Sequence, residues 1–313
     1  MTRHLRSVLD IDSGEMGRIL ALSAQLKENR LAFRDKLSGK SIGMVFAKPS
    51  TRTRVSFEVG IHELGGNAMF LPAGGATGLQ VTRGESHHDT AKVLSRYCHA
   101  LVVRTFEQNH IDALAKHGSI PIVNALTDTY HPCQALADTL TLRERFGDDL
   151  RGVTLVFVGP GNNVTHSLML AGPRAGFDVV CACPEGLPPD ARVLQRAQED
   201  AAEAGTKVTV EHDVGSAVKG AQAIYTDAWV SMGQETQSAT LKAKLRDYSV
   251  TAELMATADP KAIFMHCLPA HRGEEVTEDV LDGPQSVVFD EAENRLHTQK
   301  ALLLLLMEAE PWS

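Results

Sequence analysis

A hydroxyl-rich run beside an arginine is the segment of this sequence best suited to bind an anion. Ser50, Thr51, Arg52 and Thr53 follow a short apolar run and open a predicted helix. The first amides of a helix lack partners within the helix, and the helix dipole favours negative charge there. An ordinary N-cap followed by a solvated arginine would explain the Ser-Thr pair alone. With Arg52 and Thr53 added, the segment predicts a phosphate site.

Two further polar groups have less specific signals. His131 and Gln134 stand three residues apart at the start of another predicted helix. Both could point at one ligand atom, with His131 as a neutral or charged donor to an oxyanion. A lone histidine is more often structural, however. Arg295 follows several acidic residues near the C-terminus, where a salt-bridged surface arginine is the default interpretation.

The turn at residues 159–164, Gly-Pro-Gly-Asn-Asn-Val, lies between a predicted strand and a predicted helix. It has the outline of a dinucleotide fingerprint, but Val164 stands where the third glycine belongs. Pro160 also removes one amide from the turn. The sequence therefore disfavours NAD binding. The two asparagines suit amide hydrogen bonds to a small polar substrate, or they serve as left-handed turn residues.

Two more strand ends carry side chains that could take part in binding or catalysis. Asp227 could hold an ammonium or amine, and the following residues 231–233 could fold over a substrate. An Asp N-cap with a flexible turn is the alternative. Cys267 could be a nucleophile, a hydrogen-bond partner or a small buried hydrophobe, and the last is the commonest fate of a free cysteine.

Alternating apolar segments must position these groups. The pattern predicts an α/β protein of two domains, each a mostly parallel β-sheet flanked by helices, in which ligands sit beyond the carboxyl ends of the strands. The expected domains are residues 1–147 and 148–313, with a C-terminal helix at about 291–310 packing back on the first. The predicted strands are 42–47, 68–71, 100–104, 120–124, 153–158, 178–182, 207–211, 223–226 and 262–266. The predicted helices include 16–30, with Ser13 as N-cap, 89–97, 134–146 and 191–204.

Composition limits the partners. The chain has 313 residues and a net charge of -8 from 31 basic and 39 acidic side chains. That balance argues against general nucleic-acid binding and against an anionic membrane surface. Five cysteines without a CxxC pair, and no HExxH pattern, give no support to a metal site. The first residues do not fit a signal peptide, and the apolar run 301–307 is too short to span a bilayer, so a cytoplasmic protein is expected.

Taken together, the motifs resemble one family. The run 46–58, Phe-Ala-Lys-Pro-Ser-Thr-Arg-Thr-Arg-Val-Ser-Phe-Glu, resembles the carbamoyl-phosphate signature of the aspartate/ornithine carbamoyltransferase family, and 131–134, His-Pro-Cys-Gln, resembles its second phosphate-side motif. The segments 231–233, Ser-Met-Gly, and 266–269, His-Cys-Leu-Pro, resemble the ornithine branch. The resemblance implies transfer of the carbamoyl group of carbamoyl phosphate to the δ-amine of L-ornithine, giving citrulline and phosphate, in arginine biosynthesis. It also implies no cofactor and no metal, and a homotrimer or an assembly of trimers.

The resemblance further implies roles for individual residues. For carbamoyl phosphate they are Ser50, Thr51, Arg52, Thr53, Gln80, Arg104, His131, Gln134, Cys267, Leu268 and Arg295, of which Arg104, His131, Cys267 and Arg295 would be catalytic. For ornithine they are Leu126, Asn163, Asp227, Ser231 and Met232. Gln80 would reach the site of a neighbouring subunit, and Cys267 and Leu268 would lie between the substrates.

One departure and two alternatives accompany the resemblance. Pro160 stands where the family usually has Asp, which puts the support of the adjacent turn in question. A carbamoyltransferase acting on another amine, such as putrescine or an acylated ornithine, is the nearest alternative function. A nucleotide-dependent oxidoreductase is the more distant one.

Overall fold

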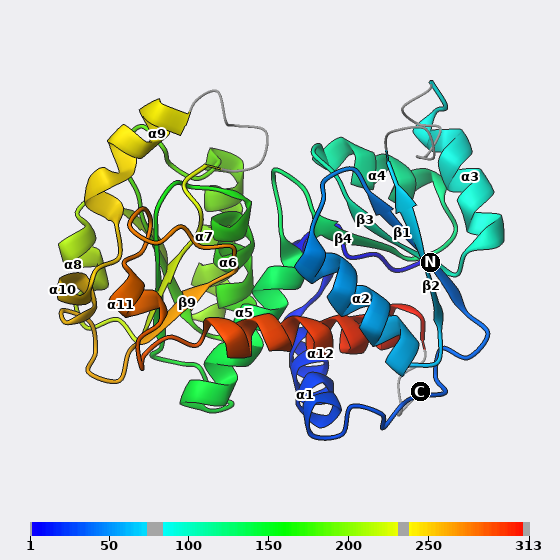
Figure 1. The fold of residues 1–313 in the computed structure, drawn as a ribbon, viewed down its shortest axis with the longest axis horizontal. Coiled ribbons are helices and arrows are strands. Elements are labelled where there is room, and N and C mark those ends of the chain that lie inside the picture. Colours follow the sequence, from blue (N-terminus) through cyan, green and yellow to red (C-terminus); the bar gives the residue numbers. More distant parts are fainter. Residues whose placement is uncertain (1, 74–83, 231–237, 309–313) are drawn as a thin grey trace. The chain divides into compact units, whose positions relative to one another are not determined.

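The computed structural model describes residues 2–73, 84–230 and 238–308. The chain forms two compact units, Met1–Leu140 with Glu293–Ser313, and Thr141–Ala292. Each unit contains a parallel sheet flanked by helices, so the predicted α/β fold class is confirmed (Figure 1). The division expected at residues 147 and 148 stays a prediction; it falls just after helix α5 (Pro132–Phe146).

The first unit is built on a sheet with the strand order β2-β1-β3-β4, all neighbours being parallel. Buried Val45 and Val103 of this sheet cluster with Ile111 of α4, and so fix one helix-covered face. Helices α2 and α12 are also in contact, because a Cβ on Gly60 would lie 3.0 Å from Cγ of Lys300. The elements are η1 (Val8–Asp10), α1 (Ser13–Glu28), β1 (Ser41–Phe46), α2 (Thr51–Glu63), β2 (Asn67–Pro72), α3 (His87–Tyr97), β3 (Ala100–Arg104), α4 (Gln108–His117), β4 (Ile122–Leu126) and most of α12 (Val288–Leu306).

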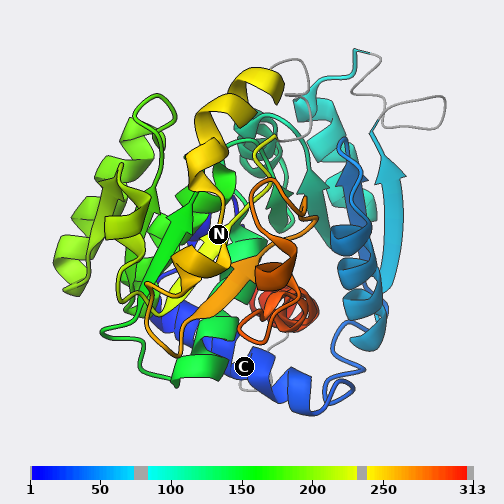
Figure 2. The ribbon, with the colours of Figure 1, turned by 60° about the vertical axis from the view of Figure 1, so that its left-hand side comes forward.

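The second unit has a sheet with the strand order β7-β6-β5-β8-β9, again parallel throughout. One face packs on α8, α10 and α11 through a cluster that includes Val158, Val218 and Phe264. Helix α6 approaches β6 so closely that a Cβ on Gly172 would lie 2.6 Å from the Val179 side chain. The elements are β5 (Thr154–Val158), α6 (Asn163–Ala175), β6 (Asp178–Ala182), α7 (Ala191–Ala204), β7 (Val208–Glu211), α8 (Val214–Val218), β8 (Ala223–Thr226), α9 (Ser238–Leu245), η4 (Arg246–Tyr248), α10 (Ala252–Met255), β9 (Ile263–His266) and α11 (Glu278–Leu281). Figure 2 shows the strands of this sheet from a second direction.

Local capping chemistry explains where several helices begin. Helix α1 is capped by Asp12 and not by Ser13, because Asp12 and Glu15 form a reciprocal capping box. The predicted N-cap Ser13 is therefore wrong by one residue. Helix α12 begins at Val288 and ends at Leu306. Of the helices within the described ranges, none combines the length and the apolar character needed to cross a membrane.

Candidate functional site

Ser50 shapes the predicted phosphate segment at the junction of β1 and α2. Its hydroxyl accepts a hydrogen bond from the backbone N–H of Thr53 at 3.2 Å and donates one to the Thr53 hydroxyl at 3.0 Å. Arg52 is exposed in the first turn of the helix, whereas Thr53 is buried. The strand–cap–helix arrangement expected from the sequence is therefore present, with the positive end of the helix dipole at Thr51. Anion binding at this helix start stays a prediction.

A buried hydrogen-bond network lies directly behind this helix start. Arg295 of α12 donates to Oε1 of Gln134 at 2.6 Å and to the hydroxyl of Thr53 at 3.4 Å. Gln134 in turn donates to Asp138 at 2.8 Å. Arg295 is only 5% exposed, so its default interpretation as a surface arginine is wrong. The fold brings together three residues that lie far apart in the sequence, and it ties a guanidinium to the predicted phosphate segment.

His131 precedes α5 in a strongly cationic environment. Burial lowers the pKa of His131 well below its ordinary value of 6.5, and the positive charges of Arg295 and Arg104 lower it further. The imidazole is therefore neutral at pH 7, so of the two forms considered for His131 the neutral one is favoured. Arg104 ends β3 and pairs in register with Leu126 at the end of β4. Both residues thus lie at the carboxyl edge of the first sheet, where a ligand is expected.

Two buried groups near this edge, one in a loop and one in the first turn of α5, were not among the predicted site residues. The buried ammonium of Lys48 pairs with Asp128 and lies 4.4 Å from the ring centroid of Phe106. Lys48 thus connects the loop before α2 to the loop before His131. The thiol of Cys133 is buried, and burial raises its pKa to about 12 although Arg295 opposes the shift. Cys133 is therefore a protonated thiol at neutral pH and not a nucleophile.

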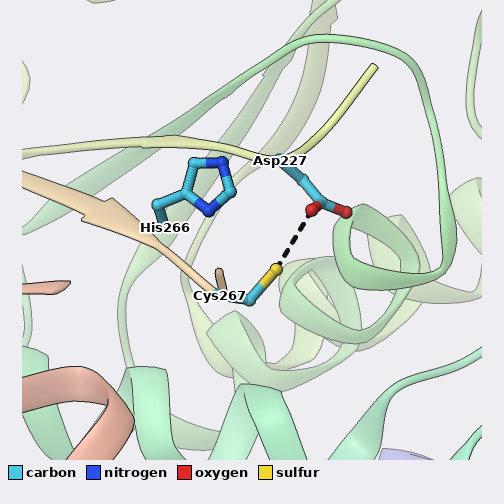
Figure 3. A group of neighbouring side chains, drawn as sticks. All are labelled: Asp227, His266 and Cys267. Carbon is cyan, nitrogen blue, oxygen red and sulfur yellow. Dashed lines mark hydrogen bonds between the residues drawn. The ribbon is translucent and has the colours of Figure 1, made fainter. Parts of the chain in front are cut away.

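In the second unit, Asp227 is held at the end of β8 by three donors. Its Oδ1 accepts from the Cys267 thiol at 3.1 Å and from the Ala228 N–H at 2.8 Å, and its Oδ2 accepts from the side-chain amide of Asn162 at 2.8 Å. Figure 3 shows the Asp227 carboxylate and the Cys267 thiol pointing toward each other. Of the three readings of Cys267, the hydrogen-bond partner is the one the structure supports.

Asn162 was not among the predicted site residues, which included only its neighbour Asn163. Asn162 caps α6 by accepting from the N–H groups of Val164 and Thr165, both at 3.0 Å. Its φ of -119° is extended, so the left-handed turn interpretation is wrong for Asn162. Asn163 is the first residue of α6, and its carbonyl accepts from Ser167. The Asn162 side chain thus both caps α6 and donates a hydrogen bond to Asp227.

The turn that contains Pro160 packs against a neighbouring segment. The N–H of Gly161 donates to the carbonyl of Leu187 at 2.9 Å, and a Cβ on Gly161 would lie 2.1 Å from the nitrogen of Pro189. The Pro160 carbonyl accepts from the hydroxyl of Thr165 at 3.4 Å. Pro160 is therefore accommodated in a closed turn that leads directly to the cap of α6.

Asp227, His266 and Cys267 form a cluster whose oxygen, nitrogen and sulfur atoms are close enough to share a metal ion. His266, however, uses both ring nitrogens: Nδ1 accepts from the Leu268 N–H at 2.8 Å, and Nε2 lies 3.3 Å from Glu275. A coordinating imidazole needs a free lone pair, so these hydrogen bonds argue against a metal at this cluster. The predicted site residues Gln80, Ser231 and Met232 lie outside the described residues.

A capped helix start that is predicted to bind phosphate in one parallel α/β unit, and a carboxylate beside a thiol in the other, are the arrangement expected of an α/β transferase. Residues 3–144 match the family description "Aspartate/ornithine carbamoyltransferase, carbamoyl-P binding domain", and residues 151–306 match "Aspartate/ornithine carbamoyltransferase, Asp/Orn binding domain". The chain belongs to the aspartate/ornithine carbamoyltransferase family.

Relatives that carry a more specific name match over nearly the whole chain. An ornithine carbamoyltransferase of Symbiobacterium thermophilum is 53% identical over 307 residues, covering 97% of this chain and 98% of the relative. An anabolic ornithine carbamoyltransferase of Pyrococcus furiosus is 52% identical over 271 residues, covering 87% of this chain and 85% of the relative. The solved structure of an ornithine carbamoyltransferase from Pyrococcus furiosus has a TM-score of 0.93 at 48% identity, covering 98% of this chain and 97% of that one.

Proposed function

We propose that this chain is an ornithine carbamoyltransferase of arginine biosynthesis. It transfers the carbamoyl group of carbamoyl phosphate to the δ-amine of L-ornithine and releases citrulline and phosphate. The names of relatives that match nearly the full chain at about half identity support this reaction. The observation that carries it in the structure is the network of Thr53, Gln134 and Arg295 behind a capped helix start.

The first unit supplies the groups for carbamoyl phosphate. The amides and hydroxyls of residues 50–53, together with the Arg52 guanidinium, bind the phosphate group. Arg104 and Arg295 add positive charge beside His131. His131 donates a hydrogen bond to the carbamoyl oxygen. Because its ring is neutral, it adds no fourth positive charge to those of the three arginines around the anion.

The second unit supplies the groups for ornithine. Asp227 is a fixed carboxylate, and its partners Asn162 and Cys267 orient both of its oxygens. A carboxylate in this setting attracts an ammonium or amine, which is the chemistry of the ornithine side chain and α-amino group. Asn163, at the start of α6, and residues 231 and 232 complete the predicted ornithine site in this unit. Leu126 of the first unit is predicted to contact ornithine as well, and Gln80 is predicted to contact carbamoyl phosphate.

The reaction needs no covalent enzyme intermediate, because the carbamoyl group already carries phosphate as a good leaving group. The δ-amine nitrogen attacks the carbonyl carbon, and a tetrahedral oxyanion forms. The bond between that carbon and the phosphate oxygen then breaks, the amine proton passes to the departing phosphate, and citrulline is left. Arg104, His131 and Thr53 stabilise the oxyanion, and the remaining task of the protein is to place the reactants.

Assembly and location form part of the proposal. A homotrimer, or an assembly of trimers, in the cytoplasm agrees with the resemblance and with the acidic composition of the chain. Sedimentation of the purified chain measures the assembly directly. A monomer with full activity would contradict the proposed trimer.

A colorimetric assay of carbamoylated product from carbamoyl phosphate and a panel of amines tests the function. Ornithine should give citrulline, whereas putrescine and N-acetylornithine should give little product. Arg52→Ala should lower kcat/KM at least about 100-fold, the size of loss typical of removing one oxyanion or phosphate donor. Arg54→Ala is the matched control, because Arg54 is exposed two residues later and is engaged with Glu58 and the ring of Phe70. Citrulline formation by Arg52→Ala at the rate of the control would contradict the proposed site.

A further inference from the structure

The segment that follows β9 is fixed from several sides in the second unit. The backbone N–H of His266 donates to Oε2 of Glu291 at 2.9 Å, while Oε1 of Glu291 accepts from the Tyr225 hydroxyl at 3.1 Å. One residue further along, the thiol of Cys267 donates to Asp227. The position of this thiol therefore depends on how the backbone of residues 266–268 is held.

The His266 imidazole is locked in a single tautomer. Its Nδ1 accepts the Leu268 N–H at 2.8 Å, so Nδ1 carries no proton, and the ring proton sits on Nε2. Nε2 lies 3.3 Å from Oε1 of Glu275 and donates to it. Both side chains are fully buried. A carboxylate that fixes the tautomer of a histidine leaves the other ring nitrogen as a dependable acceptor.

Glu275 is ionised in spite of its burial. Burial by itself raises the pKa of Glu275, but the hydrogen bonds from the His266 ring and from the His271 backbone N–H outweigh it and lower the pKa below its ordinary value. The carboxylate therefore remains an acceptor at neutral pH and keeps the His266 proton on Nε2. Because the Glu275 side chain is fully buried, its negative charge acts on His266 and does not face a substrate.

The backbone N–H that donates to His266 belongs to Leu268, a residue with an unusual backbone conformation. Leu268 has a φ of 57°, in the left-handed region that a non-glycine residue keeps only where its surroundings hold it there. The backbone N–H of Leu268 donates to Nδ1 of His266, and this hydrogen bond helps to hold the peptide group between Cys267 and Leu268. If that acceptor is lost, Leu268 can relax to an ordinary φ, and the adjoining Cys267 moves relative to Asp227.

We infer that His266 is a positioning residue for carbamoyl transfer: with Glu275 behind it, its Nδ1 holds the Leu268 peptide in the left-handed conformation that aims Cys267 at Asp227. The inference rests on the proposed function, since Cys267, Leu268 and Asp227 are the residues proposed to meet the substrates. His266 itself touches no substrate in this scheme and acts through the backbone. Its loss should therefore lower kcat and raise the KM for ornithine, because Cys267 is a hydrogen-bond partner of Asp227.

Two amide substitutions, each of which reproduces the position of one ring nitrogen, separate positioning from general packing. In His266→Asn the side-chain oxygen takes the place of Nδ1 and can still accept the Leu268 N–H. In His266→Gln the amide reaches toward Glu275, but the acceptor at the Nδ1 position is lost. Displacing a reacting group by about 1 Å costs about 100-fold in rate. We expect kcat of His266→Gln to fall about 100-fold and that of His266→Asn to stay within about tenfold of wild type, with similar melting temperatures for both.

The control and the partner residue complete the test. His212→Gln removes a ring in the same unit whose Nδ1 lies 2.8 Å from the Cys183 carbonyl, and it should leave kcat unchanged. Glu275→Gln keeps an acceptor for Nε2 and should resemble His266→Asn, whereas Glu275→Leu frees the tautomer and should resemble His266→Gln. If a His266 variant fails to fold, the two Glu275 variants make the same comparison. Equal kcat values within each pair would overturn the inference. A wild-type chain that makes no citrulline would instead overturn the proposed function.

Discussion

The neutral, buried imidazole of His131 should be visible in the pH dependence of stability. In the unfolded chain this histidine titrates near its ordinary pKa of 6.5, whereas in the folded chain burial and then the charges of Arg295 and Arg104 keep its pKa well below that value. Between the two pKa values the unfolded state binds a proton that the folded state does not. The free energy of unfolding must therefore rise with pH up to about pH 6.5 and fall as the solution becomes more acidic.

The size of this effect follows from proton linkage. One proton bound only by the unfolded state contributes a slope that approaches about 1.4 kcal/mol per pH unit well below pH 6.5. His131→Gln cannot take up this proton and should lack the slope. Arg295→Met should keep part of it, because removing one positive charge raises the folded-state pKa of His131 toward 6.5 and narrows the pH window.

Denaturant unfolding of wild type and His131→Gln between about pH 5 and pH 7.5 measures the difference. His62→Gln serves as a control in the same unit, since His62 is exposed on α2, and it should retain the wild-type excess slope. If His131→Gln and the wild type lose stability in parallel below pH 6.5, the imidazole is not held neutral and the assignment of a neutral donor is wrong.

Three further changes test the second unit. Asn162→Ala removes the cap of α6 and should cost about 0.5–2 kcal/mol of unfolding free energy, and it should raise the KM for ornithine because Asp227 loses a donor; an unchanged KM would separate the cap from the site. Gly161→Ala places a Cβ 2.1 Å from the Pro189 nitrogen and should lower the melting temperature, which a thermal scan would show; a melting temperature equal to wild type would mean that the turn can move. Cys267→Ser keeps a donor to Asp227, so the melting temperature should change little, whereas replacement of the sulfur should impair ornithine use in steady-state kinetics; the reverse pattern would favour a purely structural thiol.

Local chemistry made much of the fold predictable. The start of α2 could be read from Ser50 and the residues after it, because an N-cap uses a side chain and an amide only three positions apart. The strands β3, β6 and β8 have the predicted limits, since each is a short apolar run between turns. The prediction of Ser13 as the N-cap of α1 is wrong, although the Asp12–Glu15 spacing of a capping box is present in the sequence.

Long-range contacts made other features unpredictable from single segments. Nothing near Arg295 in the sequence indicates that its partners Gln134 and Thr53 lie more than a hundred residues away, so its neighbouring acidic residues favoured a surface ion pair. The pair of Asn162 and Asn163 posed a different difficulty. Only the observed backbone shows which of two adjacent amides faces Asp227 and which begins the helix.

The left-handed conformation of Leu268 has a consequence for engineering this chain. A programme that seeks thermal stability by relieving unfavourable dihedral angles would select this position early and replace the leucine with glycine or asparagine. Such a variant would remove a local penalty and could pass every screen based on melting temperature. It would also give the peptide freedom to leave the geometry that the His266 ring enforces. Selection for stability at this position should therefore always be paired with selection for turnover.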